Sequence, residues 1–253
     1  MAPVEVQPAA RGVAENPYAA IIFDMDGLLL DTETIYTACF DELFASLGAT
    51  FDQQFKTTIM GLSSHDTAEM CTRTFKLPLT AEEFQQRVKA LQLARFPSCV
   101  PMPGAQATVG ALRRRALRLA VATSSMESTF RAKTGHHPAL FAAMDVIVTG
   151  DDPAVRRGKP APDIYLEAAR RLAVRPEHCL AFEDSPNGVR AARAAGMPCI
   201  WIPDAVLDYT GPRYADLGRD PGVLRLASLE HFDLDRCHCQ LQKQAMAHRP
   251  QQD

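Results

Sequence analysis

The chain has 253 residues, of which 47% are hydrophobic and 23% charged, and its 27 basic and 30 acidic residues give a net charge of −3. These values are typical of one large globular domain, or of a domain that carries an insertion. No apolar run reaches the length of a membrane span and no basic patch suits a nucleic acid backbone, so we expect neither partner.

The N-terminal segment and the cysteines bear on the cellular compartment. Residues 1–17 contain Pro and Ala but no continuous apolar segment of the secretory kind, and we expect a flexible N-terminal arm there. An organellar presequence stays open, although Glu5 and Glu15 argue against it. Seven cysteines without Cys-x-x-Cys pairs favour reduced thiols, so we expect a cytoplasmic protein.

The first predicted strand ends at two carboxylates. An apolar run at residues 21–23 predicts a buried strand that ends at Asp24 and Asp26, with Gly27 directly after them. Ligands of open α/β sheets lie just beyond the carboxyl ends of such strands. Two neighbouring acids are costly to bury unless a shared proton or a cation such as Mg²⁺ relieves their repulsion. An isolated pair of this kind is more often two solvated turn carboxylates, so the rest of the chain must decide.

Residues 34–102 are expected to form an all-helical domain. Apolar residues recur at helical spacing over residues 35–47, and no strand is predicted before the break at residues 101–104. Thr80 and Glu83 have the spacing of a capping box at the start of a later helix. We therefore expect a helical cap inserted after the first strand.

Beyond residue 103 strands and helices alternate, which predicts a parallel sheet with helices on both faces. The expected strands cover residues 117–122, 146–148, 179–182, 199–202 and 223–226, and the expected helices between them 105–115, 126–133, 162–172 and 187–195. We predict a Rossmann-like three-layer α/β core built from residues 18–33 and 103–235. The polar residues 236–253 have few apolar anchors and are expected to be a mobile tail.

Polar residues also follow two later strands and the loop between them. Thr123 and Ser124 follow the strand that ends at residue 122, Lys159 lies in the loop, and Glu183 and Asp184 follow the strand that ends at residue 182. In a parallel sheet these ends meet at one edge. Phosphoryl transfer uses a nucleophile, a metal, a lysine and hydroxyl or amide donors together. Each residue alone has a commoner structural explanation, such as a helix cap or a surface lysine, but their joint order favours phosphoryl transfer.

On these residues the chain resembles the haloacid dehalogenase-like superfamily, in its phosphatase branch with a helical cap. The four motifs stand in the family's order: Asp24-Met25-Asp26-Gly27, Thr123, Lys159 and Glu183-Asp184. This resemblance covers nearly all of the chain from Tyr18 to about Asp204. Within that branch the chain is similar to the pseudouridine-5′-phosphatases and the plant glycerol-phosphate phosphatases.

The resemblance implies the catalytic roles. Asp24 would be the nucleophile that forms an aspartyl-phosphate, and Asp26 would protonate the leaving alkoxide and later activate water. Thr123 and the amide of Ser124 would bind the phosphoryl oxygens. Lys159 would keep Asp24 ionised and neutralise the transferring group.

The resemblance also implies a Mg²⁺ site and a substrate loop. Asp24, Asp184 and the carbonyl of Asp26 would ligate Mg²⁺, with Glu183 as an indirect or alternate ligand. Gly27 would let the backbone bend around the substrate. The cap loop residues expected to contact the leaving group are Gly61, Leu62 and Ser63.

We therefore expect a Mg²⁺-dependent phosphatase, a monomer or weak dimer, that acts on pseudouridine 5′-phosphate or a related nucleotide, sugar or glycerol phosphate. Three alternatives remain: a sugar-phosphate mutase, a dehalogenase and a non-catalytic binding protein. β-Phosphoglucomutases carry a lysine before the loop glycine and an arginine three residues after it, where this chain has Met60 and Ser64. Asp26 and the acidic pair argue against a dehalogenase. The cap loop offers no cation, which favours an uncharged, hydroxyl-rich leaving group.

Overall fold

The computed structural model describes residues 16–59 and 64–248. Residues 1–15 of the expected arm, residues 249–253 of the expected tail, and the loop residues Gly61, Leu62 and Ser63 lie outside the described residues. Within the described ranges, no helix is long and apolar enough to cross a membrane.

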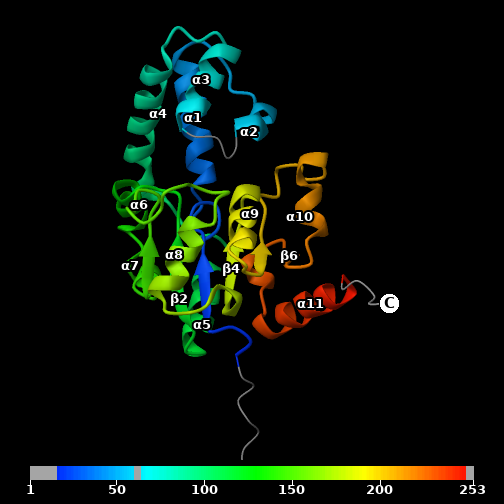
Figure 1. The fold of residues 1–253 in the computed structure, drawn as a ribbon. Coiled ribbons are helices and arrows are strands. Elements are labelled where there is room, and N and C mark those ends of the chain that lie inside the picture. Colours follow the sequence, from blue (N-terminus) through cyan, green and yellow to red (C-terminus); the bar gives the residue numbers. More distant parts are fainter. Residues whose placement is uncertain (1–15, 60–63, 249–253) are drawn as a thin grey trace, which may run out of the picture.

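A six-stranded parallel sheet forms the centre of the structure, in the order β3-β2-β1-β4-β5-β6 (Figure 1). The strands are β1 (Ala20–Phe23), β2 (Arg118–Ala122), β3 (Val146–Val148), β4 (Cys179–Glu183), β5 (Cys199–Trp201) and β6 (Val223–Arg225). The expected α/β fold is confirmed, because each strand lies within two residues of its predicted position. The central strand β1 pairs with β2 and β4, which come from distant parts of the chain.

Side chains of β1 alternate between the two faces of the sheet, as strand geometry requires. Ile21 and Phe23 pack in one buried cluster with residues of α5 (Ala105–Arg114) and α11 (Leu234–Ala247). Ala20 and Ile22 pack in a second cluster with residues of α8 (Asp163–Arg171) and α9 (Pro186–Ala194). Both faces of β1 are therefore covered, which explains its continuous apolar run. The remaining core helices are α6 (Glu127–Thr134), α7 (Pro138–Phe141) and α10 (Ala215–Arg219).

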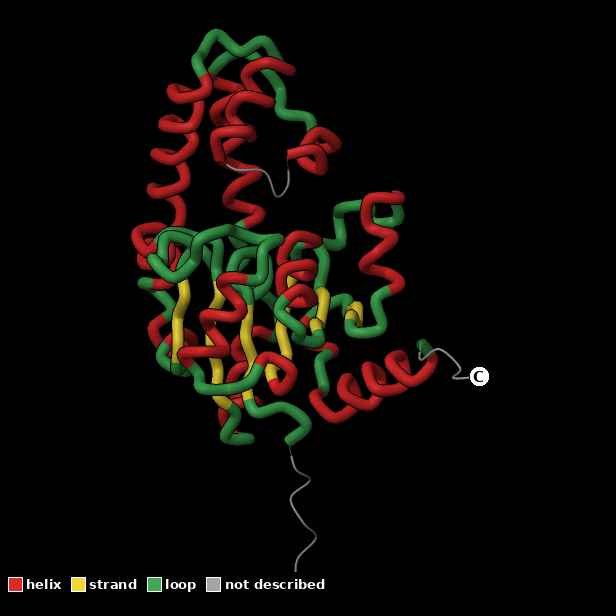
Figure 2. Tube along the Cα trace, in the orientation of Figure 1, coloured by secondary structure: helices red, strands yellow, loops and turns green. Residues whose placement is uncertain are grey.

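Four helices, which we call the cap helices, stand above the carboxyl ends of the strands (Figures 1 and 2). They are α1 (Glu33–Ser46), α2 (Gln53–Ile59), α3 (Ser64–Thr74) and α4 (Ala81–Arg95), and a short 3-10 turn at Phe96–Ser98 follows them. The predicted capping box at α4 is confirmed: Thr80 Oγ1 accepts from the Glu83 amide at 3.1 Å, and the Thr80 amide donates to the Glu83 carboxylate at 2.9 Å. The cap helices enclose a buried cluster of their own.

Two chain segments join the cap helices to the core, and they lie side by side. The Asp31 amide donates to the Val100 carbonyl at 2.9 Å, and the Met102 amide donates to the Leu29 carbonyl at 3.0 Å. Leu30 and Pro101 form an antiparallel bridge between these bonds. The insertion therefore begins and ends at one point of the core.

The C-terminal segment differs from the expected mobile tail. Residues 234–247 form α11, in which Leu234, Cys237 and Leu241 are buried against the same cluster as β1. Arg115 adds a bidentate pair to the Asp235 carboxylate, with both nitrogen–oxygen distances at 2.9 Å. The expectation rested on polar composition, whereas three apolar residues spaced three and four apart are enough to dock one helix face.

The cap cluster supplies a stability test. Phe44 is fully buried, and its ring centroid lies 4.9 Å from that of Phe75 and 5.2 Å from that of Phe51. We expect Phe44→Ala to lower the free energy of unfolding by about 3 to 5 kcal/mol, because it leaves a cavity that the cap helices cannot fill. Urea denaturation measures this change.

Leu93 on α4 is the matched control, since it is 40% exposed. Leu93→Ala should change the free energy of unfolding by less than about 0.5 kcal/mol. Equal losses in the two variants would contradict a cap with a packed interior.

Candidate active site

The strand register brings the predicted polar residues to one level. Phe23 of β1 pairs with Val121 of β2 and with Phe182 of β4, so the next residue of each strand lies at the same height. Those next residues are Asp24, Ala122 and Glu183. The Asp24 amide continues the ladder by donating to the Phe182 carbonyl at 2.9 Å. The sheet edge therefore places Asp24 directly beside the acidic pair.

Lys159 lies at the centre of this edge. Its ammonium donates to Asp24 Oδ1 at 2.5 Å, to Glu183 Oε1 at 2.6 Å and to the Ala122 carbonyl at 3.0 Å. The three protons of an ammonium therefore have three acceptors. The Lys159 side chain is only 6% exposed. Although Lys159 belongs to a loop, its side chain therefore points into the site and not into solvent.

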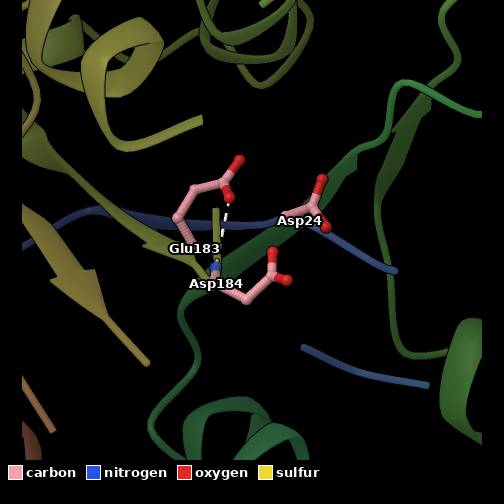
Figure 3. A group of neighbouring side chains, drawn as sticks. All are labelled: Asp24, Glu183 and Asp184. Atoms are coloured by element: carbon pink, nitrogen blue, oxygen red, sulfur yellow. Dashed lines mark hydrogen bonds between the residues drawn. The ribbon is translucent and has the colours of Figure 1, made fainter. Parts of the chain in front are cut away.

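Three carboxylates gather around a common space at the strand ends (Figure 3). Asp24, Glu183 and Asp184 each offer one oxygen within 4.8 Å of the others, and all three side chains are buried. Burial raises the pKa of Asp24 to about 7; Lys159 opposes this rise, and the neighbouring carboxylates add to it. Burial and the Asp24 carboxylate also raise the pKa of Asp184. This excess of negative charge is the condition that a bound cation relieves.

Glu183 differs from the two aspartates because both of its oxygens are already bonded. Besides Lys159, Oε1 accepts from the Tyr165 hydroxyl at 2.8 Å. Oε2 accepts from the amides of Asp184 and Ser185 and from the Ser185 hydroxyl, each at 3.1 Å. The first of these Oε2 bonds is the dashed line in Figure 3. Glu183 therefore holds Lys159 and the start of α9 in place.

Asp26 points to a different set of partners. Its Oδ2 accepts from the Ser125 hydroxyl at 2.8 Å and from the Thr123 hydroxyl at 3.2 Å, and its Oδ1 accepts from the Lys133 ammonium at 2.5 Å. Burial would raise the pKa of Asp26, but the Lys133 ammonium and the Ser125 hydroxyl hold it below its ordinary value. The two aspartates of the first motif therefore occupy separate electrostatic environments, each with its own lysine.

Lys133 is a site residue that sequence reasoning missed. It lies near the end of α6 with its side chain 1% exposed, and its ammonium also donates to the Tyr36 hydroxyl at 2.7 Å and to the Ser125 hydroxyl at 2.8 Å. The signal for it is weak, because a lysine at the end of a helix is ordinarily a solvated residue. Lys133 is buried because α6 packs against the 3-10 turn at Phe96–Ser98, which follows the cap helices.

Two glycines are required by close approach at this site. Gly27 has a φ of +77°, and a Cβ there would overlap the Asp184 carboxylate. Gly188 lies in the first turn of α9, where a Cβ would overlap the Glu183 carboxylate. The expected bend at Gly27 is therefore present, and it brings the chain against Asp184.

Residues 21–202 match the family model described as haloacid dehalogenase-like hydrolase. The chain belongs to this family. It is 39% identical to (DL)-glycerol-3-phosphatase 1, mitochondrial, of Arabidopsis thaliana, over 85% of this chain and 72% of that protein. It is 36% identical to a Saccharomyces cerevisiae protein named probable pseudouridine-5′-phosphatase, over 86% and 95% respectively. CbbY from Rhodobacter sphaeroides, crystallised in complex with phosphate, matches at a TM-score of 0.66 and 30% identity, over 85% of this chain and 96% of that one.

A cleft of about 510 Å³ lies between the cap helices and the core of this hydrolase. Asp26, Ser124 and Ser125 line its core side, which places the predicted phosphate-binding residue Ser124 at the cleft. The cap helices and the turn after them contribute aromatic, amide and basic side chains: Tyr36, Phe40, Phe84, Phe96, Gln85, Gln92, Lys56 and Lys89. The sequence analysis looked for a cation only in the loop at residues 60–65, whereas Lys56 and Lys89 bring two cations to the cleft from the cap helices.

The contact between Gly188 and Glu183 gives the hydrolase a test of site integrity. Gly188→Ala should lower the free energy of unfolding by about 1 to 3 kcal/mol, because the new methyl group displaces a buried, fully bonded carboxylate. Chemical denaturation measures the loss.

Gly218→Ala is the control, since a Cβ at this position of α10 meets nothing within 4 Å. It should be neutral or stabilising by up to about 1 kcal/mol. A Gly188→Ala protein as stable as the control would mean that α9 does not press on Glu183.

Proposed function

We propose that this hydrolase is a Mg²⁺-dependent phosphomonoesterase that works through an aspartyl-phosphate on Asp24. The observation that carries the proposal is the buried Asp24 carboxylate, which a buried lysine contacts at 2.5 Å and which shares its space with Asp184. A nucleophilic carboxylate must be ionised and correctly oriented, and the ammonium of Lys159 favours both. The Arabidopsis thaliana and Saccharomyces cerevisiae relatives are both named as phosphatases, which supports the same reaction class.

The donor set fits a hard divalent cation. Three buried carboxylates face one buried ammonium, so two negative charges are left without a matching charge at the sheet edge. We propose Asp24, Asp184 and the Asp26 carbonyl as the protein ligands of Mg²⁺. Glu183 acts through Lys159 and not as a direct ligand, because both its oxygens already accept hydrogen bonds. When bound, Mg²⁺ would neutralise charge on the phosphoryl oxygens.

The residues of this chain account for both chemical steps. In the first step an Asp24 oxygen bonds to phosphorus, the ester phosphorus–oxygen bond breaks, and Asp26 gives its proton to the leaving alkoxide. In the second step Asp26 takes a proton from water, whose oxygen attacks phosphorus and releases Asp24 and inorganic phosphate. Thr123, the Ser124 amide and Lys159 would hold the phosphoryl oxygens. Asp26 must be protonated for the first step, and the charge of an arriving phosphate dianion favours that proton.

We propose residues 34–102 as a cap that closes over the leaving group, with residues 18–33 and 103–235 as the catalytic core. Closure over the cleft would exclude water while Asp26 acts as an acid. Aromatic walls such as Phe40 and Phe84, together with the amides of Gln85 and Gln92, suit a flat, hydrogen-bonding leaving group. The substrate class is therefore a nucleoside, sugar or glycerol monophosphate, with pseudouridine 5′-phosphate favoured by the aromatic lining.

We also propose a reducing compartment, the cytoplasm, for this enzyme. All seven cysteines are unpaired, and all except Cys239 are buried. Buried free thiols are the pattern of proteins that keep their cysteines reduced.

The nucleophile supplies the first test. Asp24→Asn should lower kcat for p-nitrophenyl phosphate by about 1,000-fold or more, because an amide cannot form the acyl-phosphate bond. Chelation of Mg²⁺ should abolish the wild-type rate, and added Mg²⁺ should restore it.

Asp216→Asn is the control for the loss of a carboxylate elsewhere. Asp216 is an exposed residue that pairs with Arg190 on another part of the core. Its variant should keep the wild-type rate. An Asp24→Asn enzyme with undiminished, Mg²⁺-dependent turnover would remove the centre of the proposal.

The leaving group is tested by a substrate series. We expect kcat/KM for pseudouridine 5′-phosphate to exceed that for glycerol 3-phosphate, because a base held by the cleft adds binding energy. It should also exceed that for uridine 5′-phosphate, because the carbon-linked base carries one more N–H donor for the amide side chains of the cleft. Phosphate release under Mg²⁺ saturation measures each value. A clear preference for glycerol 3-phosphate would assign the enzyme to the polyol esters instead.

A further inference from the structure

Lys133 lies between Asp26 and the cap helices, and the proposed chemistry leaves it without a role. Its ammonium has three acceptors, which are Asp26 Oδ1 at 2.5 Å, the Tyr36 hydroxyl at 2.7 Å and the Ser125 hydroxyl at 2.8 Å. All three donors are therefore used, as at Lys159. The side chain is 1% exposed, so its charge is withdrawn from water.

The other contacts of Lys133 come from the two ends of the cap. The ammonium lies 4.6 Å from the ring centroid of Phe96 and 5.2 Å from that of Tyr36. Tyr36 is in the first turn of α1, and Phe96 directly follows α4. The two rings meet edge to face at 5.9 Å. Lys133 thus contacts the start of α1 through Tyr36 and the turn after α4 through Phe96.

Packing alone does not explain a charged residue in this place. Burying an ammonium costs several kcal/mol, and an apolar side chain of the same length fills space at lower cost. The carboxylate it faces is held on both oxygens: Oδ1 accepts from Lys133 and, at 3.4 Å, from the Tyr36 hydroxyl, and Oδ2 accepts from the hydroxyls of Ser125 and Thr123. Such a carboxyl group cannot rotate freely. A proton donor needs this restraint, because its oxygen must lie within hydrogen-bond reach of the leaving group.

We infer that Lys133 is a positioning residue that orients the carboxyl group of Asp26 toward the leaving oxygen and makes that orientation depend on the seating of Tyr36 and Phe96 at the base of the cap. The inference rests on the proposed phosphatase function. When the cap is seated, the two rings enclose the ammonium and Asp26 is held. When α1 and the Phe96–Ser98 turn move away, Lys133 loses the Tyr36 hydroxyl and both rings.

The experiment compares two esters that differ in their need for a proton. A glycerol alkoxide leaves only with protonation, whereas p-nitrophenolate leaves without it, so a general acid assists the first ester more. Lys133→Met keeps the side-chain length and removes the charge. We expect kcat/KM for glycerol 3-phosphate to fall by about 100-fold and that for p-nitrophenyl phosphate by less than about 10-fold. The ratio kcat/KM reports only the first transfer step, before water is activated.

Asp26 provides the benchmark for this pattern. Asp26→Asn should show the same dependence on the leaving group, and adding Lys133→Met to it should cause little further loss, because both changes remove one function. Lys243→Met is the control, since Lys243 is an exposed cation of α11 that does not line the cleft. It should leave the ratio of the two kcat/KM values unchanged.

Tyr36→Phe tests the link to the cap and serves if Lys133→Met does not fold. It keeps the ring and removes the hydroxyl that accepts from Lys133 and donates to Asp26 Oδ1 at 3.4 Å, so a loss of about 3- to 10-fold is expected for glycerol 3-phosphate alone. Equal losses for both esters, or additive losses in the double variant, overturn the inference and leave the phosphatase proposal standing. A wild-type enzyme with no Mg²⁺-dependent activity on either ester or on pseudouridine 5′-phosphate overturns both.

Discussion

The structure depends on burying one ammonium, that of Lys159, between the carboxylates of Asp24 and Glu183. Each of these groups alone would be expensive to take out of water, and only their mutual contact makes the arrangement tolerable. The parallel register supplies that contact, because it sets Asp24 and Glu183 at the same height on adjacent strands. Gly27 and Gly188 then allow the surrounding chain to approach the carboxylates without a side chain in between.

Much of this edge could be predicted from the sequence, for a physical reason. Strands such as residues 20–23 and 179–183 can be recognised from their apolar runs. Parallel strands place their carboxyl ends at the same edge of the sheet, whatever chain segment connects them. The position of Lys159 followed from the family's motif order. Its three acceptors follow from the fold, and one of them, the Ala122 carbonyl, is backbone that no side-chain pattern reveals.

Other features could not be predicted because they depend on packing between distant segments. Lys133 becomes a buried residue only where α6 meets Tyr36 and Phe96, which lie 97 and 37 positions away. Helix α11 carries few apolar residues, and they stabilise its docking only because the surface they contact is also apolar. The cap lysines show the same limit, since Lys56 and Lys89 reach the cleft from helices and not from the loop that the motif singles out.

The paired segments at the base of the cap have a consequence for how such a protein can change over time. Because a β-bridge joins Leu30 and Pro101, the roughly seventy residues between them form an insertion whose two ends are adjacent. A short turn, or an unrelated domain with closely spaced termini, would close the same gap without disturbing any strand of the sheet. Exchange of the inserted helices would leave Asp24, Lys159 and Asp184 in place at the strand ends, so under the proposed function a new cap would change the ester that is accepted and not the reaction.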